Sequence, residues 1–547
     1  MGRGGRPVQS VQARAPLLIA RTHSNLTMNW RALFFATTLA VYGAGVAAHA
    51  ADRPNIVYVL ADDLGYGDVK ALNPNGKIAT PNMDRIAAEG MSFTDAHGSA
   101  SVCTPSRYSI LTGRYSWRTR LQSGVLGGVS PHLIEAGRLT VAALLKQNGY
   151  TTACIGKWHL GMDWVEKAGV TRALGDSART ADPWSIDYAK PISNGPNAVG
   201  FDYFYGIAGS LDMPPFAFIE NDHVTELPTV EKGWGGRKGP AAPGFEAVDV
   251  VPTLVRQAVG YLDAHKQSGL PFFLYLPLTS PHTPLVPSPD WKGKSGINPY
   301  ADFVMETDWA LGEVLRALDR DGLTHNTVVI FASDNGAAPA ADFTELAAHG
   351  HNPSYIFRGR KSDIWDGGHR IPFLVRWPGK VAPASVSHQV VGLGDLMATC
   401  ADILGTTLPD DAGEDSVSIL PALFGTATGP VHEAIVHQSV EGRFSIREGN
   451  WKLEICPGSG GNSKPTDPTA AKKGLPSLQL YDMSTDVGET KNVEGAQPQV
   501  VERLATILGH YVAAGRSTPG ATQRNDVPVD IWKDDANSGG ETDDGGD

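Results

Sequence analysis

Four continuous apolar runs of strand length occur along the chain, and each ends abruptly in polar residues. They cover residues 55–61, 150–155, 272–276 and 327–332. A short apolar run without polar alternation is typical of a strand buried on both faces of a parallel sheet. Helical patterns separate the runs, at residues 83–90, 140–148, 250–265 and 302–318. This alternation predicts an α/β fold with a mostly parallel sheet sandwiched by helices.

The pattern changes near residue 408. Short β-like stretches follow one another at residues 433–437, 443–446, 451–455 and 478–482. A 3.6-residue apolar stripe at 499–513 then predicts a closing helix. We therefore expect a large domain over residues 51–407 and a smaller C-terminal subdomain over 408–523 with an antiparallel sheet.

The sequence predicts that the segments at both ends of the chain lie outside the folded domains. Residues 28–50 contain an apolar run and close on Ala-His-Ala, which predicts a signal peptide cleaved after Ala50. A retained membrane span is the weaker alternative, so we expect an exported protein, periplasmic or extracellular, without stable membrane insertion. Residues 1–27 are interpreted as an upstream extension from a start codon called too early. Residues 524–547 are acidic and rich in glycine, which predicts a disordered tail.

Composition narrows the choice of partners. The formal net charge of −12 argues against a general nucleic-acid binder. Four cysteines are too few for a disulfide scaffold in a chain of this length. Cys154 and Cys400 lie in apolar patterns and read as core thiols. Cys456 is unassigned, and a disulfide with Cys400 stays open.

Polar residues that suit catalysis follow each of the four predicted strands. In open α/β sheets, ligands bind beyond the carboxyl ends of the strands, so one site is expected to gather these residues. A single Asp after a strand is more often a cap or turn residue, but four such cases favour a site. Carboxylates with a neighbouring amide suit Ca²⁺ or Mg²⁺ better than zinc. The residues are Asp62 and Asp63, Lys157 and His159, His282, and Asp334 and Asn335.

Residues 103–107, Cys-Thr-Pro-Ser-Arg, are the most specific feature of the sequence. Pro105 favours a helix start, which places Cys103 beside a helix N-terminus with Arg107 one turn later. Backbone N–H groups and the helix dipole favour an anion there. A buried structural cysteine or an ordinary thiol nucleophile is the alternative for Cys103 alone.

The same five residues resemble the C-x-P-x-R signature of type I sulfatases, in which the cysteine is oxidised to formylglycine. Further sequence motifs that resemble those of this family occur in the same order as in the family. They lie at residues 62–68, 156–161, 280–282, 333–336, and 358–361 with 366–372. The resemblance covers about residues 53–510, and over this range the sequence is similar to arylsulfatase A and N-acetylgalactosamine-6-sulfatase. It implies an alkaline-phosphatase-like catalytic domain over residues 51–407.

The resemblance also implies a metal site and the roles of its neighbours. One Ca²⁺ would be held by Asp62, Asp63, Asp334, Asn335 and the modified Cys103. Arg107, Lys157 and Lys361 would surround the sulfate with positive charge. Arg360 is an alternative to Lys361. Maturation would require a formylglycine-generating enzyme as partner.

The mechanism implied by the family begins with the hydrated aldehyde at position 103. One hydroxyl attacks sulfur, a covalent sulfate ester forms, and the alcohol leaves. His159 would deprotonate the remaining hydroxyl, and His282, together with Lys361, would protonate the leaving alcohol. The implied function is hydrolysis of a sulfate monoester in an aryl sulfate, another small molecule or a sulfated oligosaccharide.

Three other functions fit parts of the sequence. A phosphonate or phosphate ester hydrolase of the same superfamily is the main alternative. A catalytically silent carbohydrate-binding protein and a cysteine hydrolase with an unmodified thiolate are the others. Segments between the family blocks are expected to contact substrate, and candidate contacts to sugar hydroxyls are Asp212, His349, His351 and His369.

Overall fold

A computed structural model describes residues 53–170 and 182–533. The expected upstream extension and signal peptide lie outside the described residues. Over the ranges that are described, no helix combines the length and apolarity needed to cross a membrane.

The middle of a ten-stranded sheet is parallel, with the strand order β11-β1-β10-β4-β5. The bounds are β1 (Asn55–Ala61), β4 (Thr151–Lys157), β5 (Tyr203–Ile207), β10 (Phe272–Pro277) and β11 (Thr327–Ser333). All four apolar runs are therefore strands, as predicted, and they are neighbours. The predicted α/β class with a mostly parallel sheet is confirmed.

Strands that the apolar pattern did not predict extend this sheet on both sides. Beyond β11, β12 and β2 pair antiparallel and β13 pairs parallel with β2; beyond β5, β6 and β7 are antiparallel. Two separate two-stranded pairs, β3–β14 and β8–β9, lie outside it. The bounds are β2 (Met91–Phe93), β3 (Ala96–His97), β6 (Ile219–Glu220), β7 (His223–Val224), β8 (Val230–Trp234), β9 (Arg237–Ala241), β12 (Phe373–Arg376), β13 (Ser385–Ser387) and β14 (Val391–Gly392).

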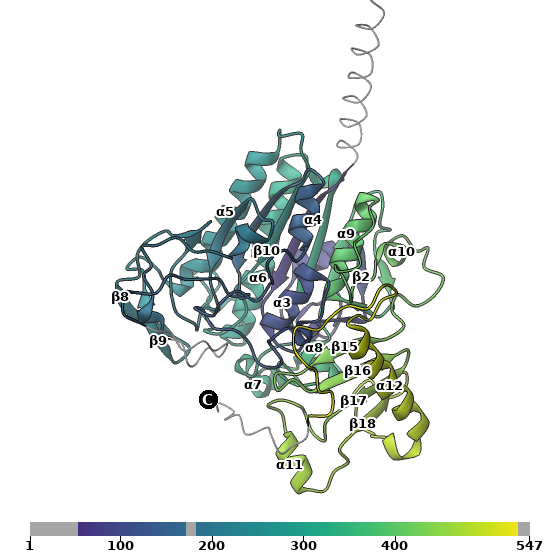
Figure 1. The fold of residues 1–547 in the computed structure, drawn as a ribbon. Coiled ribbons are helices and arrows are strands. Elements are labelled where there is room, and N and C mark those ends of the chain that lie inside the picture. The colour runs from purple at the N-terminus through teal and green to yellow at the C-terminus, as the bar shows by residue number, and fades with distance from the viewer. Residues whose placement is uncertain (1–52, 171–181, 534–547) are drawn as a thin grey trace, which may run out of the picture. The chain divides into compact units, whose positions relative to one another are not determined.

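Helices cover both faces of the sheet because successive side chains of a buried strand point to opposite faces. In β1, Tyr58 packs in a core with α3, α4 and α9, whereas Val57 and Val59 pack in a second core with α2, α5 and α6. The bounds are α2 (Pro81–Glu89), α3 (Cys103–Thr112), α4 (Val141–Gln147), α5 (Val250–His265), α6 (Pro299–Arg320) and α9 (Leu396–Leu404). Shorter helices are α7 (Phe343–Ala348), α8 (Asp366–His369), α10 (Leu420–Leu423) and α11 (Asp467–Lys472). Figure 1 shows β10 in this sheet among the helices α4, α5 and α6.

The close approach of β4 to its neighbours depends on Gly156. Its φ is +144°, and a Cβ built there would lie 1.9 Å from the carbonyl oxygen of Pro277. Only glycine fits both restrictions. This glycine sets the position of Lys157 at the end of the strand.

The predicted C-terminal antiparallel sheet is also confirmed, and it has the strand order β15-β16-β17-β18 (Figure 1). The bounds are β15 (Ile435–Gln438), β16 (Phe444–Glu448), β17 (Trp451–Glu454) and β18 (Gln479–Asp482). The closing helix α12 (Pro498–Ala514) buries Leu504 and Leu508 in the core of this sheet. The domain boundary near residue 408 stays a prediction.

The first ten residues of the expected acidic tail are not a free tail. Asp526 accepts hydrogen bonds from Arg114, at 3.1 Å, and Asn525 accepts one from Arg118, at 3.0 Å. The backbone N–H of Asp526 also donates to the Arg118 carbonyl. The prediction of disorder is therefore wrong for residues 524–533, because buried arginines bind them. Residues 534–547 lie outside the described residues.

Asn298 caps the N-terminus of α6. Its Oδ1 accepts from the Ala301 N–H at 3.0 Å, and its Nδ2 donates to the Ala341 carbonyl at 3.1 Å. We expect Asn298→Ala to lower the free energy of unfolding by about 1 kcal/mol, measured by denaturant titration. Asn298→Ser, which retains a capping oxygen, should lose less; an equal loss in both variants would contradict the capping role.

Candidate active site

The polar residues that follow the four parallel strands come together at one edge of the sheet, as predicted. β11 and β1 are in register from Asn55 with Thr327 to Ala61 with Ser333, which brings Asp62 level with Asp334. β10 and β4 lie on the other side of β1 and carry His282 and Lys157 to the same edge. The site therefore arises from the carboxyl ends of adjacent strands.

Asp63 has a left-handed backbone. Its φ is +68°, which is uncommon for a residue with a side chain. The conformation is held by its N–H, which donates to Asp334 Oδ1 at 3.2 Å, and by its carbonyl, which accepts from the Tyr300 hydroxyl at 3.2 Å. The turn lets two consecutive carboxylates, Asp62 and Asp63, serve the same site.

Three buried carboxylates are each paired with a cation. Arg107 donates to Asp334 Oδ2 from Nε at 3.0 Å and from Nη2 at 2.7 Å. Lys157 Nζ donates to Asp62 Oδ2 at 2.7 Å. Lys361 Nζ lies 2.7 and 2.8 Å from the two oxygens of Asp63. Burial favours the neutral acid, yet Lys157, His282 and Arg107 hold the pKa of Asp62 well below its usual range.

Cys103 is the first residue of α3, as the sequence predicted, and its side chain is buried. Its Sγ donates to Asp62 Oδ1 at 3.5 Å and accepts from Lys361 Nζ at 3.7 Å. Burial raises the pKa of this thiol well above its ordinary value, although Lys157 and Lys361 oppose the shift. An unmodified Cys103 is therefore a neutral thiol, whereas cysteine hydrolases use a thiolate.

Lys361, and not Arg360, contacts this site. The Arg360 guanidinium lies 5.6 Å from the ring centroid of Phe343. The two side chains point to different partners because they are adjacent in an irregular segment. The alternative assignment of Arg360 is not supported by these contacts.

His159 has one free ring nitrogen. Its Nε2 lies 2.7 Å from the Leu126 carbonyl, which only accepts, so Nε2 carries the proton and Nδ1 carries the lone pair. Nδ1 is buried and has no hydrogen-bond partner within residues 53–170 and 182–533. Burial and the nearby Lys157 and Arg107 lower the pKa of His159 well below its ordinary value. The ring is therefore neutral. The backbone carbonyl of His159 accepts a hydrogen bond from the Thr104 hydroxyl at 3.0 Å, which links this residue to α3.

His282 lies against Asp63, with its Nε2 3.6 Å from Asp63 Oδ2. Its Nδ1 lies 2.6 Å from the Thr283 carbonyl, which fixes this nitrogen as a donor. Ser210 Oγ lies 3.1 Å from the same nitrogen and accepts from Lys157 Nζ at 3.2 Å. Ser210 lies in residues 209–216, one of the segments between family blocks that were expected to contact substrate, but nothing in its local pattern singled it out from other loop serines.

The donor set fits a hard divalent cation. Ligand atoms of Asp62, Asp63, Cys103 and His282 lie within 4.8 Å of one another. Asn335 donates from Nδ2 to Asp63 Oδ1 at 2.7 Å, and its Oδ1 is buried without a hydrogen-bond partner in the described part of the chain. An orphaned amide oxygen beside carboxylates is a ligand of the kind that Ca²⁺ takes. The ligand roles of Asp62, Asp63, Cys103, Asp334 and Asn335 stay predictions.

Two of the residues expected to contact a sugar, His351 and His369, are buried and contact other protein groups. His351 is buried, and its Nε2 lies 2.8 Å from Asp68 Oδ1. His369 is buried in a histidine cluster. Those two expectations are wrong, because both side chains lie in the interior. Asp212 lies 3.7 Å from Arg237, and His349 is exposed.

The four cysteines are free and buried. Cys400 packs in the core with α3, α4 and α9, whereas Cys456 packs against Ile364 and Trp365. The open alternative of a disulfide between Cys400 and Cys456 is therefore not realised in this structure.

Comparison with known proteins identifies the fold and family. The sequence model of the sulfatase family matches residues 54–406. An N-acetylgalactosamine-6-O-sulfatase of Bacteroides thetaiotaomicron is 33% identical, and the alignment covers 83% of this chain and 92% of that protein. Arylsulfatase A of Homo sapiens is 34% identical over 85% of this chain and 89% of its own length.

Solved structures agree with the sequence relatives. A Bacteroides thetaiotaomicron structure from work on the metabolism of glycosaminoglycans superposes with a TM-score of 0.71 and 32% identity, covering 84% of this chain and 99% of that one. A phosphonate monoester hydrolase of Agrobacterium radiobacter, at 18% identity and a TM-score of 0.52, shares the fold over 84% of this chain and 95% of its own. The chain belongs to the sulfatase family of sulfuric ester hydrolases, and its fold is alkaline-phosphatase-like.

Proposed function

We propose that this sulfatase releases inorganic sulfate from the sulfate monoester of a carbohydrate, with formylglycine at position 103 as the nucleophile. The observation that supports it most is the position of Cys103. It begins a helix, and its sulfur lies within reach of Lys361 and Asp62 in a site with two buried cations, Arg107 and Lys157, and the half-buried Lys361. Fixed positive charges suit the charge that develops on sulfate oxygens during transfer.

Formylglycine at this position requires a partner enzyme. A formylglycine-generating enzyme oxidises the Cys103 side chain to an aldehyde: the carbon–sulfur bond breaks, the sulfur leaves as hydrogen sulfide, and molecular oxygen is reduced to water with two further electrons from a thiol reductant. Because Cys103 is buried in the folded chain, we expect this step to precede complete folding. Water then adds to the aldehyde and gives a carbon with two hydroxyl groups.

The proposed reaction has two chemical steps. One hydroxyl at position 103 attacks sulfur and gives its proton to Asp62, whose Oδ1 lies 3.5 Å from the Cys103 sulfur. The bond from sulfur to the substrate oxygen breaks, and His282 supplies the proton that makes the leaving group an alcohol. The free Nδ1 of His159 then accepts the proton of the second hydroxyl. The carbon–oxygen bond to sulfate breaks, the aldehyde returns, and sulfate leaves. Arg107, Lys157 and Lys361 bind and orient the sulfate throughout.

Calcium is the proposed metal. Asp62, Asp63, Asp334 and Asn335 would hold it together with the modified residue 103. When bound, the ion would polarise a sulfate oxygen and screen the carboxylates from one another.

Replacement of Asp334 tests this ligand set. We expect Asp334→Ala to lower the calcium content of the purified protein to a small fraction of the wild-type value, because it removes an oxygen donor and releases Arg107. Asp334→Asn, which keeps one oxygen, should retain more calcium. Elemental analysis measures both, and an unchanged calcium content in Asp334→Ala would remove this residue from the ligand set.

One relative supports a sulfated sugar as the substrate, while another is named an arylsulfatase. A relative that aligns with 83% of this chain is named for action on N-acetylgalactosamine 6-sulfate. Comparing kcat/KM for 6-O-sulfated N-acetylgalactosamine, a chromogenic aryl sulfate and the matching phosphonate and phosphate esters would rank the substrates. Faster turnover of the phosphonate than of either sulfate would replace the proposal with the phosphonate hydrolase alternative.

We also propose export to the periplasm or the medium. The support is the signal-peptide pattern of residues 28–50, with cleavage after Ala50. N-terminal sequencing of the protein from its native host should begin at Ala51.

The experiment that tests the proposed function is mass measurement of the peptide that contains Cys103, paired with an assay of sulfate release. The expected mass loss corresponds to conversion of the CH₂–SH side chain to CHO. Conversion together with sulfate release supports the proposal. An intact thiol in protein that also releases no sulfate, even after co-expression with the formylglycine-generating enzyme, would favour a silent binding protein.

A further inference from the structure

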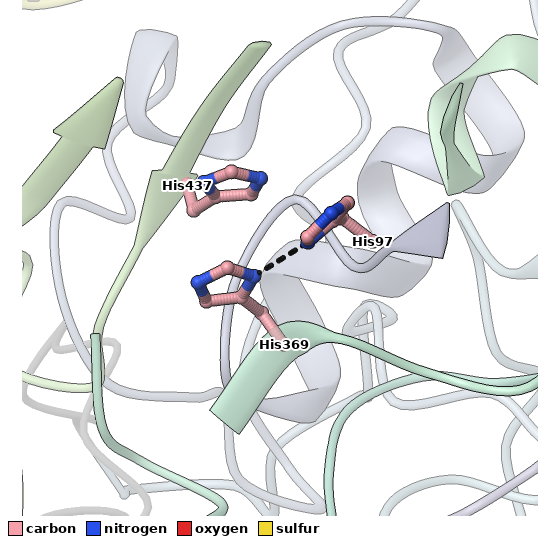
Figure 2. Close-up of side chains that lie close together, drawn as sticks. All are labelled: His97, His369 and His437. Carbon is pink, nitrogen blue, oxygen red and sulfur yellow. Dashed lines mark hydrogen bonds between the residues drawn. The ribbon is translucent and has the colours of Figure 1, made fainter. Parts of the chain in front are cut away.

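Three buried histidines form a cluster apart from the candidate active-site residues, with their rings close together (Figure 2). His97 lies on β3, His369 ends α8 and His437 lies on β15. The rings of His369 and His437 are stacked with centroids 3.9 Å apart, and the His97 ring lies 4.8 Å from His437. One nitrogen from each ring lies within 4.8 Å of the others.

Hydrogen bonds determine which nitrogens of two rings carry protons. His97 Nε2 lies 2.8 Å from Asp95 Oδ1, and His369 Nε2 lies 3.0 Å from the Ile364 carbonyl. A carboxylate and a carbonyl accept only, so both Nε2 atoms are donors. In neutral rings the two Nδ1 atoms then carry lone pairs, yet they face each other at 3.0 Å. Two lone pairs at this distance repel each other unless a cation lies with them.

Lys452 does not change this assignment. Its Nζ lies 3.2 Å from His369 Nε2 but has stronger acceptors for its three protons. These acceptors are the Ile364 carbonyl at 3.0 Å, Asp366 Oδ1 at 2.9 Å and Glu489 Oε1 at 2.5 Å.

His437 distinguishes a metal ion from a shared proton. Its Nδ1 lies 3.0 Å from Ser445 Oγ, while its Nε2 is buried and has no hydrogen-bond partner among the residues that the structure describes. A proton shared by His97 and His369 would leave that Nε2 unsatisfied. A metal ion gives all three rings a partner.

We propose that Nδ1 of His97, Nδ1 of His369 and Nε2 of His437 bind one divalent transition-metal ion, for which zinc is the best match. Imidazole nitrogens suit zinc, and three of them are a common ligand set. The His437 ring tilts out of its stack on binding, because a metal lies in the plane of each imidazole that holds it. The ion joins the segment before α3, helix α8 and the C-terminal sheet.

The hydrogen-bond partners of His97 and His369 are of the kind found around metal-binding histidines. Metal ligands of this type donate their second N–H to a carboxylate or a backbone carbonyl, as His97 and His369 do. Asp95 is itself held by Arg447, whose Nη1 and Nη2 lie 2.8 Å from its two oxygens, and by Arg370 at 3.2 Å. The first two rings are therefore already oriented for a shared ligand.

Metal analysis of the calcium-saturated protein tests the proposal. Excess calcium competes with zinc for the carboxylates of the active site, and the zinc that is lost in His437→Gln is assigned to the histidine cluster. We expect about one zinc per chain after incubation with Zn²⁺ and desalting, and visible absorption bands from nitrogen-bound Co²⁺ when cobalt replaces zinc. His437→Gln should lose most of this zinc, by more than the roughly 10- to 100-fold affinity loss typical of an outer partner.

A matched control removes a buried histidine outside the cluster. His432 is buried, and its Nε2 lies 2.8 Å from Asp395 Oδ2, so His432→Gln should keep the zinc. Circular dichroism compares the folds of the two variants. Because a variant that does not fold decides nothing, the wild-type protein is decisive. If it takes up no zinc and gives no cobalt bands, or if folded His437→Gln binds zinc as well as the wild type, the proposal is wrong.

Discussion

Replacing Cys103 with alanine is expected to lower kcat for sulfate release by at least about 10⁴-fold, because the variant has no nucleophile. The side chain is buried at the first residue of α3, and alanine fits the same space. We therefore expect the protein to remain folded. Steady-state assays with an aryl sulfate and thermal unfolding measure the two effects.

Cys400→Ala is the control for loss of a buried thiol. Cys400 packs in α9, away from the strand ends that form the site. This variant should keep its kcat, although loss of a buried sulfur lowers the free energy of unfolding. Substantial turnover by Cys103→Ala would show that the nucleophile is another group.

Lys361→Met is expected to lower kcat/KM by about 10²- to 10³-fold, the range seen when one fixed charge-stabilising donor is removed. Methionine keeps much of the length of lysine but carries no charge. The Lys361 Nζ contacts both Asp63 oxygens and Cys103 Sγ, so its charge lies where we expect the sulfate to bind. Rates should be compared at equal calcium occupancy, because Asp63 is also a proposed metal ligand.

Arg360→Gln is the matched control, since Arg360 is the adjacent cation and lies over Phe343 instead. This variant should retain nearly all of the wild-type kcat/KM. A larger loss in Arg360→Gln than in Lys361→Met would reverse the assignment of the sulfate-binding cation.

The central sheet was predictable because burial on both faces leaves a strong local signal. The apolar run at 55–61 corresponds to β1 residue for residue. The two-residue strands β6 and β7 leave no such signal, since their pairing depends on neighbours brought in by the fold. The β8–β9 hairpin was missed for a different reason: its strands are polar and form no apolar run, although the two glycines between Trp234 and Arg237 are a hairpin signal.

The candidate site was predictable where its residues directly follow strands. Asp62 and Asp334 come from strands in register, so their proximity follows from topology alone. Ser210 and the partners of His97 were not predictable, because loops distant in sequence bring them together. His369 shows the opposite error: a polar residue in a loop-like block was expected at the surface, but it lies in the interior.

The residues around Asp526 matter for how the protein is shortened or tagged. Arg114 and Arg118 follow α3, and residues 524–526 supply partners to both guanidinium groups. A chain cut before residue 524 would leave two buried positive charges with fewer acceptors, close to the helix that begins at Cys103. Affinity tags are therefore better attached after residue 533 than used to replace this segment.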